Sequence, residues 1–204
     1  MRLRASSWLR SDISPAPPKS ALRNSALAAR DALGRVQREA AAQAVAARGL
    51  PFDIAHGSVV AGYAAIRSEF DPQPLMRKLA AQGATLALPA IVAADRPLQF
   101  RAWSFGEALR RGQLGIPEPH PEAPALAPDI LLVPLAAFDR AGHRIGYGAG
   151  HYDRTLQQLR VSRPIRALGL AFAAQEIAKI PALAHDVVLD YVLTEQRVFD
   201  FWSG

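Results

Sequence analysis

The chain contains no cysteine, and this absence excludes two common ways of stabilising a small fold or building a site. Without thiols there is neither a disulfide framework nor a thiolate zinc site. Long hydrophobic runs are also missing, since no apolar stretch approaches the ~20 residues that a membrane-spanning helix needs. These absences predict a soluble protein of a reducing compartment, the cytoplasm, with no membrane partner.

The charge is unevenly distributed along the 204 residues, half of which are hydrophobic. The net charge is +6, and residues 1–48 carry nine basic and three acidic side chains, whereas the rest of the chain balances at fifteen of each. A basic segment of this kind suits a nucleic-acid arm, a targeting peptide or a local site for a multiply charged small anion. The apolar content is enough for one buried core.

Residues 1–18 are rich in Arg, Ser and Pro and show no apolar periodicity. We expect a flexible N-terminal tail there; a transit peptide is the alternative, because such peptides are rich in Arg and Ser and poor in acidic residues. Asp12 counts against the transit peptide. Residues 19–204 are expected to form one domain, and the protein is expected to be a monomer.

The pattern after the tail is that of an α/β protein. Residues 18–48 are rich in helix formers, with Gly34 dividing them into two helices. Helices and apolar strands then alternate, which predicts a single-domain parallel or mixed sheet with helices on both faces. The expected strands are 58–66, 85–92, 98–103, 129–134, 165–172 and 186–193, and the expected helices are 71–82, 151–159 and 173–180. Residues 112–128, with five prolines, are expected to form an irregular loop.

The most informative segment is a glycine-rich loop at the start of the helix expected from residue 151. Gly146, Gly148 and Gly150 alternate directly before this helix. Alternating glycines leave backbone N–H groups uncovered, and a helix N-terminus adds unpaired N–H donors and partial positive charge. The spacing fits neither the dinucleotide fingerprint nor the P-loop. We interpret the loop as a phosphate site; a glycine-rich surface turn is the alternative.

Three basic residues of the first helix share one of its sides. Lys19, Arg23 and Arg30 stand at i, i+4 and i+11, which at 100° per residue places them within about 40° of one another. Basic side chains clamp phosphoryl oxygens and offset developing charge. A solvated helix face is the alternative interpretation.

The segment VPLAAFDRAGHRIGYGAGHYDR resembles the motif of the 5-formyltetrahydrofolate cyclo-ligase family, VPG-x-AFD-x-x-G-x-RLGYGGGYYDR. The resemblance runs from the K-x-x-x-R helix at Lys19 to the D-x-x-x-D-x-V-x-T-E segment near the end of the chain. Three departures change the kind of residue: Leu135 and Ala149 replace glycines, and His151 replaces a tyrosine.

The resemblance implies an ATP-dependent enzyme that cyclises 5-formyltetrahydrofolate to 5,10-methenyltetrahydrofolate and releases ADP and phosphate. It implies that Lys19, Arg23 and Arg144 contact the ATP phosphates, with a weaker case for Arg30, and that Arg144 and Tyr152 are catalytic. The loop residues that it implies for nucleotide binding are Ile145, Gly146, Tyr147, Gly148, Ala149, Gly150, His151 and Tyr152.

The resemblance also implies a folate site and a Mg²⁺ site. Glu69 matches an acid that binds the pterin, and residues 147–151 would contact the folate. Tyr63 would pack against it, with core packing as the alternative. Asp153 and Asp190 are the expected Mg²⁺ ligands; a first-turn acid of a helix and a polar residue of an edge strand are the respective alternatives.

Two other functions share part of this pattern. A different nucleotide-dependent ligase or kinase would use the loop and the basic helix without depending on Glu69. A nucleic-acid-binding protein would use the basic first quarter, but aromatic residues are not interleaved with its positive charges and the chain after residue 48 is neutral. We therefore expect a reduced folate as the partner and no nucleic acid.

Overall fold

The computed structural model describes residues 17–183 and 186–202. The expected tail therefore lies outside the described residues, apart from its last two positions. Across the described ranges, no helix has the length and apolar character that crossing a bilayer requires.

Four α-helices accompany the sheet, and their bounds follow the periodic segments of the sequence. The first two are separated at Gly34, as expected, and Gly34 lies directly before the second of them. The Asp71 carboxylate accepts a hydrogen bond from the amide of Gln73, ahead of the third helix. The four helices are α1 (Lys19–Asp31), α2 (Arg35–Arg48), α3 (Gln73–Ala81) and α4 (His151–Ser162).

One mixed sheet of eight strands forms the centre of the fold, in the order β12-β11-β10-β7-β1-β2-β3-β6. The pairs from β11 to β2 are parallel, and the outer pairs β11·β12, β2·β3 and β3·β6 are antiparallel. The strands are β1 (Val59–Ala61), β2 (Thr85–Ala90), β3 (Gln99–Ala102), β6 (Ala125–Leu126), β7 (Ile130–Pro134), β10 (Arg166–Leu170), β11 (Tyr191–Leu193) and β12 (Val198–Asp200).

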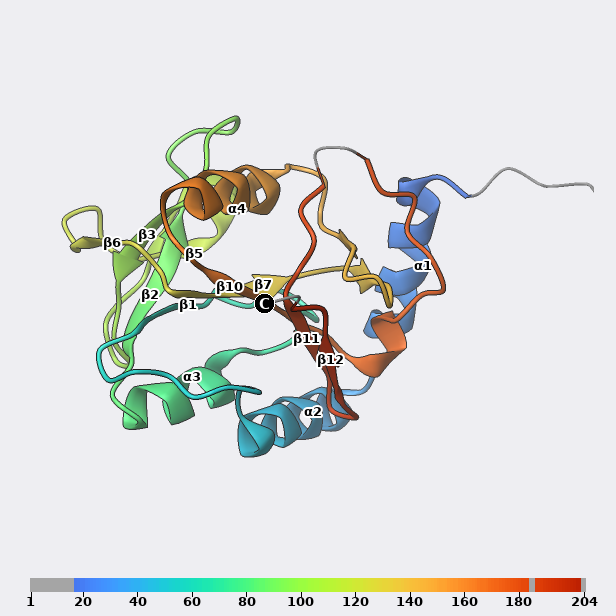
Figure 1. Cartoon of the computed structure of the whole chain (residues 1–204), viewed down its shortest axis with the longest axis horizontal. Helices are drawn as coiled ribbons and strands as arrows, with labels where there is room; N and C mark the ends of the chain where they lie inside the picture. Colours follow the sequence, from blue (N-terminus) through green and yellow to red (C-terminus); the bar gives the residue numbers. More distant parts are fainter. Residues whose placement is uncertain (1–16, 184–185, 203–204) are drawn as a thin grey trace, which may run out of the picture.

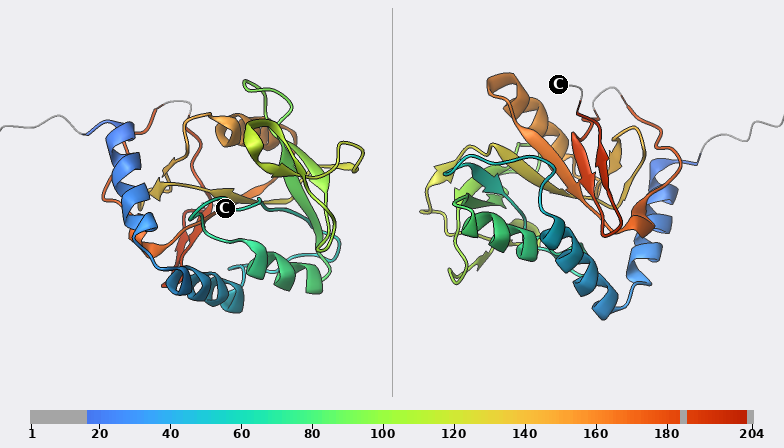
Figure 2. Two further views of the ribbon diagram at one scale, coloured as in Figure 1. Left: turned by 180° about the vertical axis from the view of Figure 1, so that it is seen from behind. Right: turned by 60° about the horizontal axis from the view of Figure 1, so that its bottom comes forward.

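The helices cover both faces of this sheet, which confirms the predicted fold class. Figure 1 shows α2 and α3 on one face and α4 on the other. Figure 2 shows α1 standing at the end of the sheet, where it packs against the β8 strand (Ala137–Phe138) and the 3₁₀ turn Ala173–Gln175. The first helix is thereby held beside elements more than 100 residues later in the chain.

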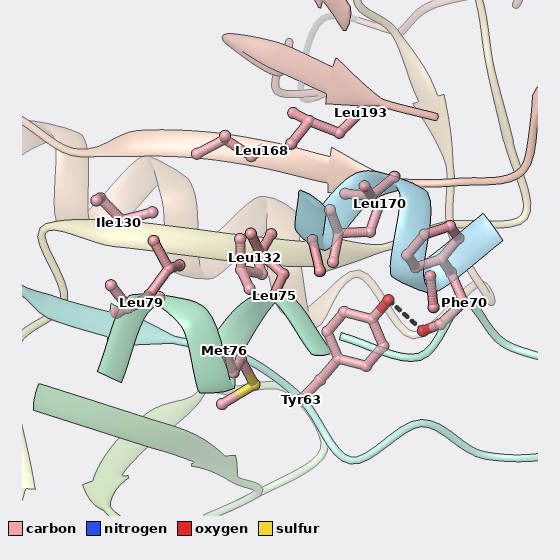
Figure 3. Packing of buried hydrophobic residues seen from close by; sticks show 14 of the residues in the cluster. Tyr63, Phe70, Leu75, Met76, Leu79, Ile130, Leu132, Leu168, Leu170 and Leu193 are labelled. Carbon is pink, nitrogen blue, oxygen red and sulfur yellow. Dashed lines mark hydrogen bonds between the residues drawn. The ribbon is translucent and has the colours of Figure 1, made fainter. Parts of the chain in front are cut away.

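Two apolar layers, one on each face, fix the central strands. On the α3 side, the leucines of the helix meet those of the neighbouring strands β7 and β10 (Figure 3). On the α4 side, Leu156 packs over Leu131 and Val133 of β7. Alternate residues of β7 therefore serve opposite layers, and the strand is buried on both sides, as its continuous apolar run predicts.

Several expected elements are shorter than the sequence suggests. The run 58–66 is a strand only at Val59–Ala61, and 186–193 only at Tyr191–Leu193. The helix expected at 173–180 is a single 3₁₀ turn. Within the expected loop 112–128 the chain forms the short strands β5 (Pro117–Glu118), paired with β4 (Arg110–Arg111), and β6. The apolar runs of the sequence therefore extend beyond the residues that pair in the sheet.

A small hairpin that the sequence analysis did not predict precedes the glycine loop. Strand β8 pairs with β9 (Arg144–Ile145) around a turn in which the buried carboxylate of Asp139 accepts hydrogen bonds from the amides of Ala141 and His143. The same carboxylate accepts a bond from the amide of Ile180. The hairpin is thus tied to a later loop and delivers residue 146 to a fixed place.

Candidate active site

A large cavity lies where the parallel strands end. Its volume is about 820 Å³, and its walls include residues at or just beyond the carboxyl ends of β1, β2 and β7, namely Tyr63, Ile91 and Pro134. Open α/β sheets bind ligands at this edge, beside the strand where the chain reverses its winding. Here that place is β1, flanked by β2 on one side and β7 on the other.

The structure brings the predicted site residues together at this cavity, with two exceptions. All of them line it except Asp190 and Arg30, the weaker of the phosphate candidates. Asp190 instead forms an ion pair with Arg160 at 2.8 Å and accepts the amide hydrogen of Ala167 at 2.7 Å, so it joins α4 to the sheet. It lies directly before β11, a strand flanked by β10 and β12.

The glycine loop crosses the cavity between β9 and α4. Gly148 has φ +100° and Gly150, directly before the helix, has φ +67°, a backbone region that favours glycine. Gly150 has no side chain to cap the first turn of α4, so the leading N–H groups of this helix are available to a ligand. Ala149 does not have a positive φ. Its extra methyl therefore brings no backbone strain.

Helix α1 contacts this loop through Arg23. The Nε atom of Arg23 donates a hydrogen bond to the carbonyl of Gly146 at 2.7 Å, and its guanidinium lies close to the α-carbon of Gly148. Lys19, one turn earlier, lines the same cavity and forms an ion pair with Asp186. Two cations of α1 are thus held at the phosphate side of the cavity.

Arg144 is a buried cation behind the loop. It is 7% exposed, and it donates to the carboxylate of Asp153 at 2.8 Å and to the carbonyl of Val187 at 2.6 Å. Burial lowers the pKa of Arg144, whereas the charge of Asp153 raises it. Asp153, in the first turn of α4, also accepts the amide hydrogen of Val187. The pair holds α4, β9 and the 187–190 segment together under the cavity.

Glu69 is presented by a strained turn on the opposite wall. Its Oε2 atom accepts the amide hydrogen of Ile66 at 2.9 Å, and its own amide donates to the carbonyl of Ile66. Arg67, inside this turn, is the one non-glycine residue with positive φ (+55°) in the described ranges. Non-glycine residues in this region cost energy and cluster at functional sites. The turn fixes a carboxylate at the cavity wall.

Two tyrosines complete this wall. Tyr63 is 4% exposed and belongs to the core, and its hydroxyl donates to the carbonyl of Phe70 at 2.8 Å (Figure 3). Burial is the main cause that raises the pKa of both Tyr63 and Tyr152, with the charge of Glu69 as the second cause. Both hydroxyls therefore remain protonated at neutral pH.

Sequence reasoning missed two contributors to this site. Asp186, which was not among the expected site residues, lines the cavity and holds Lys19. Arg154 donates to the carbonyls of Ala149 at 2.7 Å and Ala94 at 3.0 Å, which ties the glycine loop to a neighbouring segment. Arg154 is the last residue of the loop motif, and this position in the motif could have identified it as a site residue.

Comparisons with known proteins agree with this geometry. A family model described as the 5-formyltetrahydrofolate cyclo-ligase family matches residues 15–195. A relative of this name from Escherichia coli strain K12 is 32% identical over 156 residues, which are 74% of this chain and 84% of the relative. One from Mycolicibacterium smegmatis is 33% identical over 189 residues, 88% of this chain and 94% of the relative.

A solved structure extends the agreement to the fold. The NMR structure of Aquifex aeolicus 5,10-methenyltetrahydrofolate synthetase superposes with a TM-score of 0.74 at 28% identity. The match covers 91% of this chain and 94% of the other. The likeness thus includes the sheet, the helices and the edge of the sheet where the cavity lies.

The buried ion pair under the cavity generates a prediction about stability. Asp153→Asn keeps the hydrogen-bond acceptor but removes the counter-charge of Arg144. Breaking a buried pair costs about 3–5 kcal/mol, and because the Asp153 side chain is 29% exposed we expect about 2 kcal/mol in the free energy of unfolding. Urea denaturation measures it. Glu39→Gln, which breaks the exposed pair with Arg35, is the control and should change stability by less than about 0.5 kcal/mol. Equal effects of the two substitutions would contradict the assignment.

Proposed function

The chain belongs to the 5-formyltetrahydrofolate cyclo-ligase family, and we propose that it cyclises 5-formyltetrahydrofolate to 5,10-methenyltetrahydrofolate with conversion of ATP to ADP and phosphate. The observation that carries the ATP dependence is the hydrogen bond from Arg23 to the Gly146 carbonyl. It places a cationic helix on a glycine loop within the cavity that also contains Glu69. Phosphate and pterin therefore have complementary walls in one cavity.

The phosphate end of the cavity comprises backbone N–H donors and fixed cations. We propose that the loop 146–150 and the first turn of α4 bind the ATP phosphates, and that Lys19 and Arg23 neutralise their charge. Arg144 lies beneath the loop and adds positive potential from a position that burial keeps fixed. Phosphoryl transfer depends mainly on such positioning and charge stabilisation.

The reaction follows from bringing the two substrates together there. The N5-formyl oxygen attacks the γ-phosphorus, the bond to the ADP oxygen breaks, and the formyl carbon becomes an iminophosphate. N10 then attacks this carbon, loses its proton, and phosphate leaves with the former formyl oxygen. Phosphorylation converts a poor leaving group into a good one, so no protein nucleophile is required. The protonated Tyr152 hydroxyl is a hydrogen-bond donor in this region.

The folate end is defined by Glu69 and the apolar wall formed by residues of the strand ends. A carboxylate accepts two N–H donors at once, and the pterin offers its amino group and the adjacent ring N–H. We propose that Glu69 binds this edge. Tyr63 packs in the core and presents one side of its ring to the cavity.

A magnesium ion fits this cavity through one carboxylate. Mg²⁺ takes one or two protein carboxylates and otherwise binds phosphates and water, and within the described ranges no three acidic or histidine side chains gather as a metal site. Both hydrogen bonds to Asp153 end on Oδ1, so we assign Oδ2 to the metal, which would offset phosphate charge when bound. Asp190 uses both oxygens in other bonds and is not assigned to it.

Absorbance in the near ultraviolet tests the proposed reaction directly, because the methenyl product has an extended conjugated system. The purified chain with 5-formyltetrahydrofolate, Mg²⁺ and ATP should show a rising absorbance together with equimolar release of phosphate. Omission of ATP should abolish both signals. A product formed at the same rate without ATP would refute the proposed energy coupling, and the absence of product with all components would refute the function.

The loop generates a prediction about nucleotide binding. Gly148→Val places a β-branched side chain at φ +100°, where strain of about 1–3 kcal/mol deforms the loop. We expect the affinity for ATP to fall about tenfold or more by calorimetric titration. Gly57→Val is the matched control, because Gly57 has φ +81° with open space around it and lies outside the cavity lining. A loss shared by the control would assign the effect to stability rather than to the phosphate site.

The opposite wall generates a prediction about folate binding. Glu69→Gln removes the charge that accepts the pterin N–H donors, and hydrogen bonds to charged groups contribute about 1.5–3 kcal/mol. We expect 5-formyltetrahydrofolate to bind about tenfold or more weakly in a fluorescence titration, with a much smaller change for ATP. Glu122→Gln alters an exposed carboxylate and should leave both affinities unchanged. Unaltered folate affinity in Glu69→Gln would remove this residue from the site.

A further inference from the structure

We propose that Arg30 and Tyr147 are positioning residues that connect the glycine loop to Glu69, so that nucleotide phosphate bound on the loop strengthens folate binding on the opposite wall. The inference rests on the proposed function, since it assumes that the loop binds phosphate and Glu69 binds the pterin. It assigns a purpose to a buried arginine that the reaction itself does not use.

Arg30, like Arg144, is a buried arginine of the described residues. It is 3% exposed, in the last turn of α1, and a buried charge is costly unless it is paired and hydrogen-bonded. Its Nε donates to the hydroxyl of Ser68 at 3.1 Å and lies 3.6 Å from Asp31. Its Nη1 donates to the hydroxyl of Tyr147 at 2.5 Å. The guanidinium thus joins α1, the turn that presents Glu69, and the glycine loop.

Tyr147 extends this connection to Glu69. Its hydroxyl oxygen accepts from Arg30, and Tyr147 lines the main cavity together with Glu69. Burial raises the pKa of Tyr147, and the negative charge of Glu69 raises it further, so the hydroxyl stays protonated at neutral pH. Its single proton is therefore available to the Glu69 carboxylate, whose Oε2 atom accepts the amide hydrogen of Ile66.

The same side chains form the partition between two cavities. A second cavity of about 390 Å³ is lined by Arg30, Arg38 and Ser68. It shares Glu69, Tyr147 and the Ile66–Arg67 turn with the main cavity. Tyr147 and Glu69 therefore lie on the wall that the two cavities share, and Arg30 lies on the side of the second cavity.

The consequence is a coupling between the two substrates. Tyr147 stands between Gly146 and Gly148, so its backbone lies within the phosphate loop, while its hydroxyl is held by Arg30, which also holds Ser68 beside Glu69. Phosphate that binds the loop amides restricts residues 146–148 and with them the hydroxyl. Glu69 is then already oriented when the pterin binds. The entropy cost of ordering its side chain therefore no longer weakens folate binding.

The test measures this coupling as a ratio of affinities. The Kd of 5-formyltetrahydrofolate is determined for the full chain by fluorescence titration with and without saturating non-hydrolysable ATP analogue and Mg²⁺. Coupling between sites is typically 5–150-fold, and we expect about fivefold or more in the unmodified chain. Reciprocity requires that folate change the affinity of the analogue by the same factor, which provides an internal check.

Tyr147→Phe keeps the ring and removes the hydroxyl, and we expect the ratio to fall to below about twofold. Arg30→Lys keeps the charge but not the forked geometry that reaches Ser68 and Tyr147 together, and should lower the ratio as well. The double variant should fall no further than Tyr147→Phe alone, since both changes break one connection. Tyr191→Phe, in β11 and away from both cavities, is the control.

The outcomes separate this inference from the function on which it rests. A ratio that Tyr147→Phe leaves unchanged, or a ratio of one in the unmodified chain that binds both ligands, overturns the inference and leaves the proposed function standing. An unmodified chain that binds neither ligand overturns both. A decrease confined to the Tyr147 and Arg30 variants supports the connection.

Discussion

The hydrogen bond between Arg23 and the carbonyl of Gly146 joins parts of the chain that are 123 residues apart, and the site depends on it. Without it, α1 would be a basic helix and residues 146–150 a flexible glycine turn. The bond places the basic side chains of α1 next to the backbone amides of the loop. The apolar contacts of Ala26 and Leu22 with Ile145 and the nearby chain hold α1 in place, so the polar bond only needs to set the register.

The fold could be predicted where burial is continuous or periodic along the sequence. The strand Ile130–Pro134 and helix His151–Ser162 lie almost where their patterns place them. The bounds of elements that depend on strand pairing could not be predicted: of 186–193, only Tyr191–Leu193 pair as a strand with β10 and β12. The β8–β9 hairpin is two residues per strand, and its stability comes from the Asp139 carboxylate, which no apolar pattern encodes.

The sequence predicted which residues form the glycine loop and which cations flank it. It predicted less well which carboxylates line the cavity. Asp190 has the sequence context of a metal ligand, but its carboxylate forms an ion pair with Arg160 of α4. Asp186, four residues earlier, reaches Lys19 and the cavity instead. Both residues belong to a segment with little regular structure, where a difference of four positions changes the direction of a side chain without any sign in the sequence.

The three departures from the family motif occur at positions where the local space or backbone conformation allows a side chain. Leu135 fills the space over Gly169, whose missing side chain leaves room for it, so a larger residue on the strand end is matched by a small one on β10. Ala149 does not need a positive φ, unlike its glycine neighbours. His151 lies at the start of α4, with its Nδ1 atom 3.3 Å from the carbonyl of Arg96. The residues that cannot be replaced in this way are Gly148 and Gly150, whose positive φ exposes the loop and helix N–H groups, and the chain retains glycine at both positions.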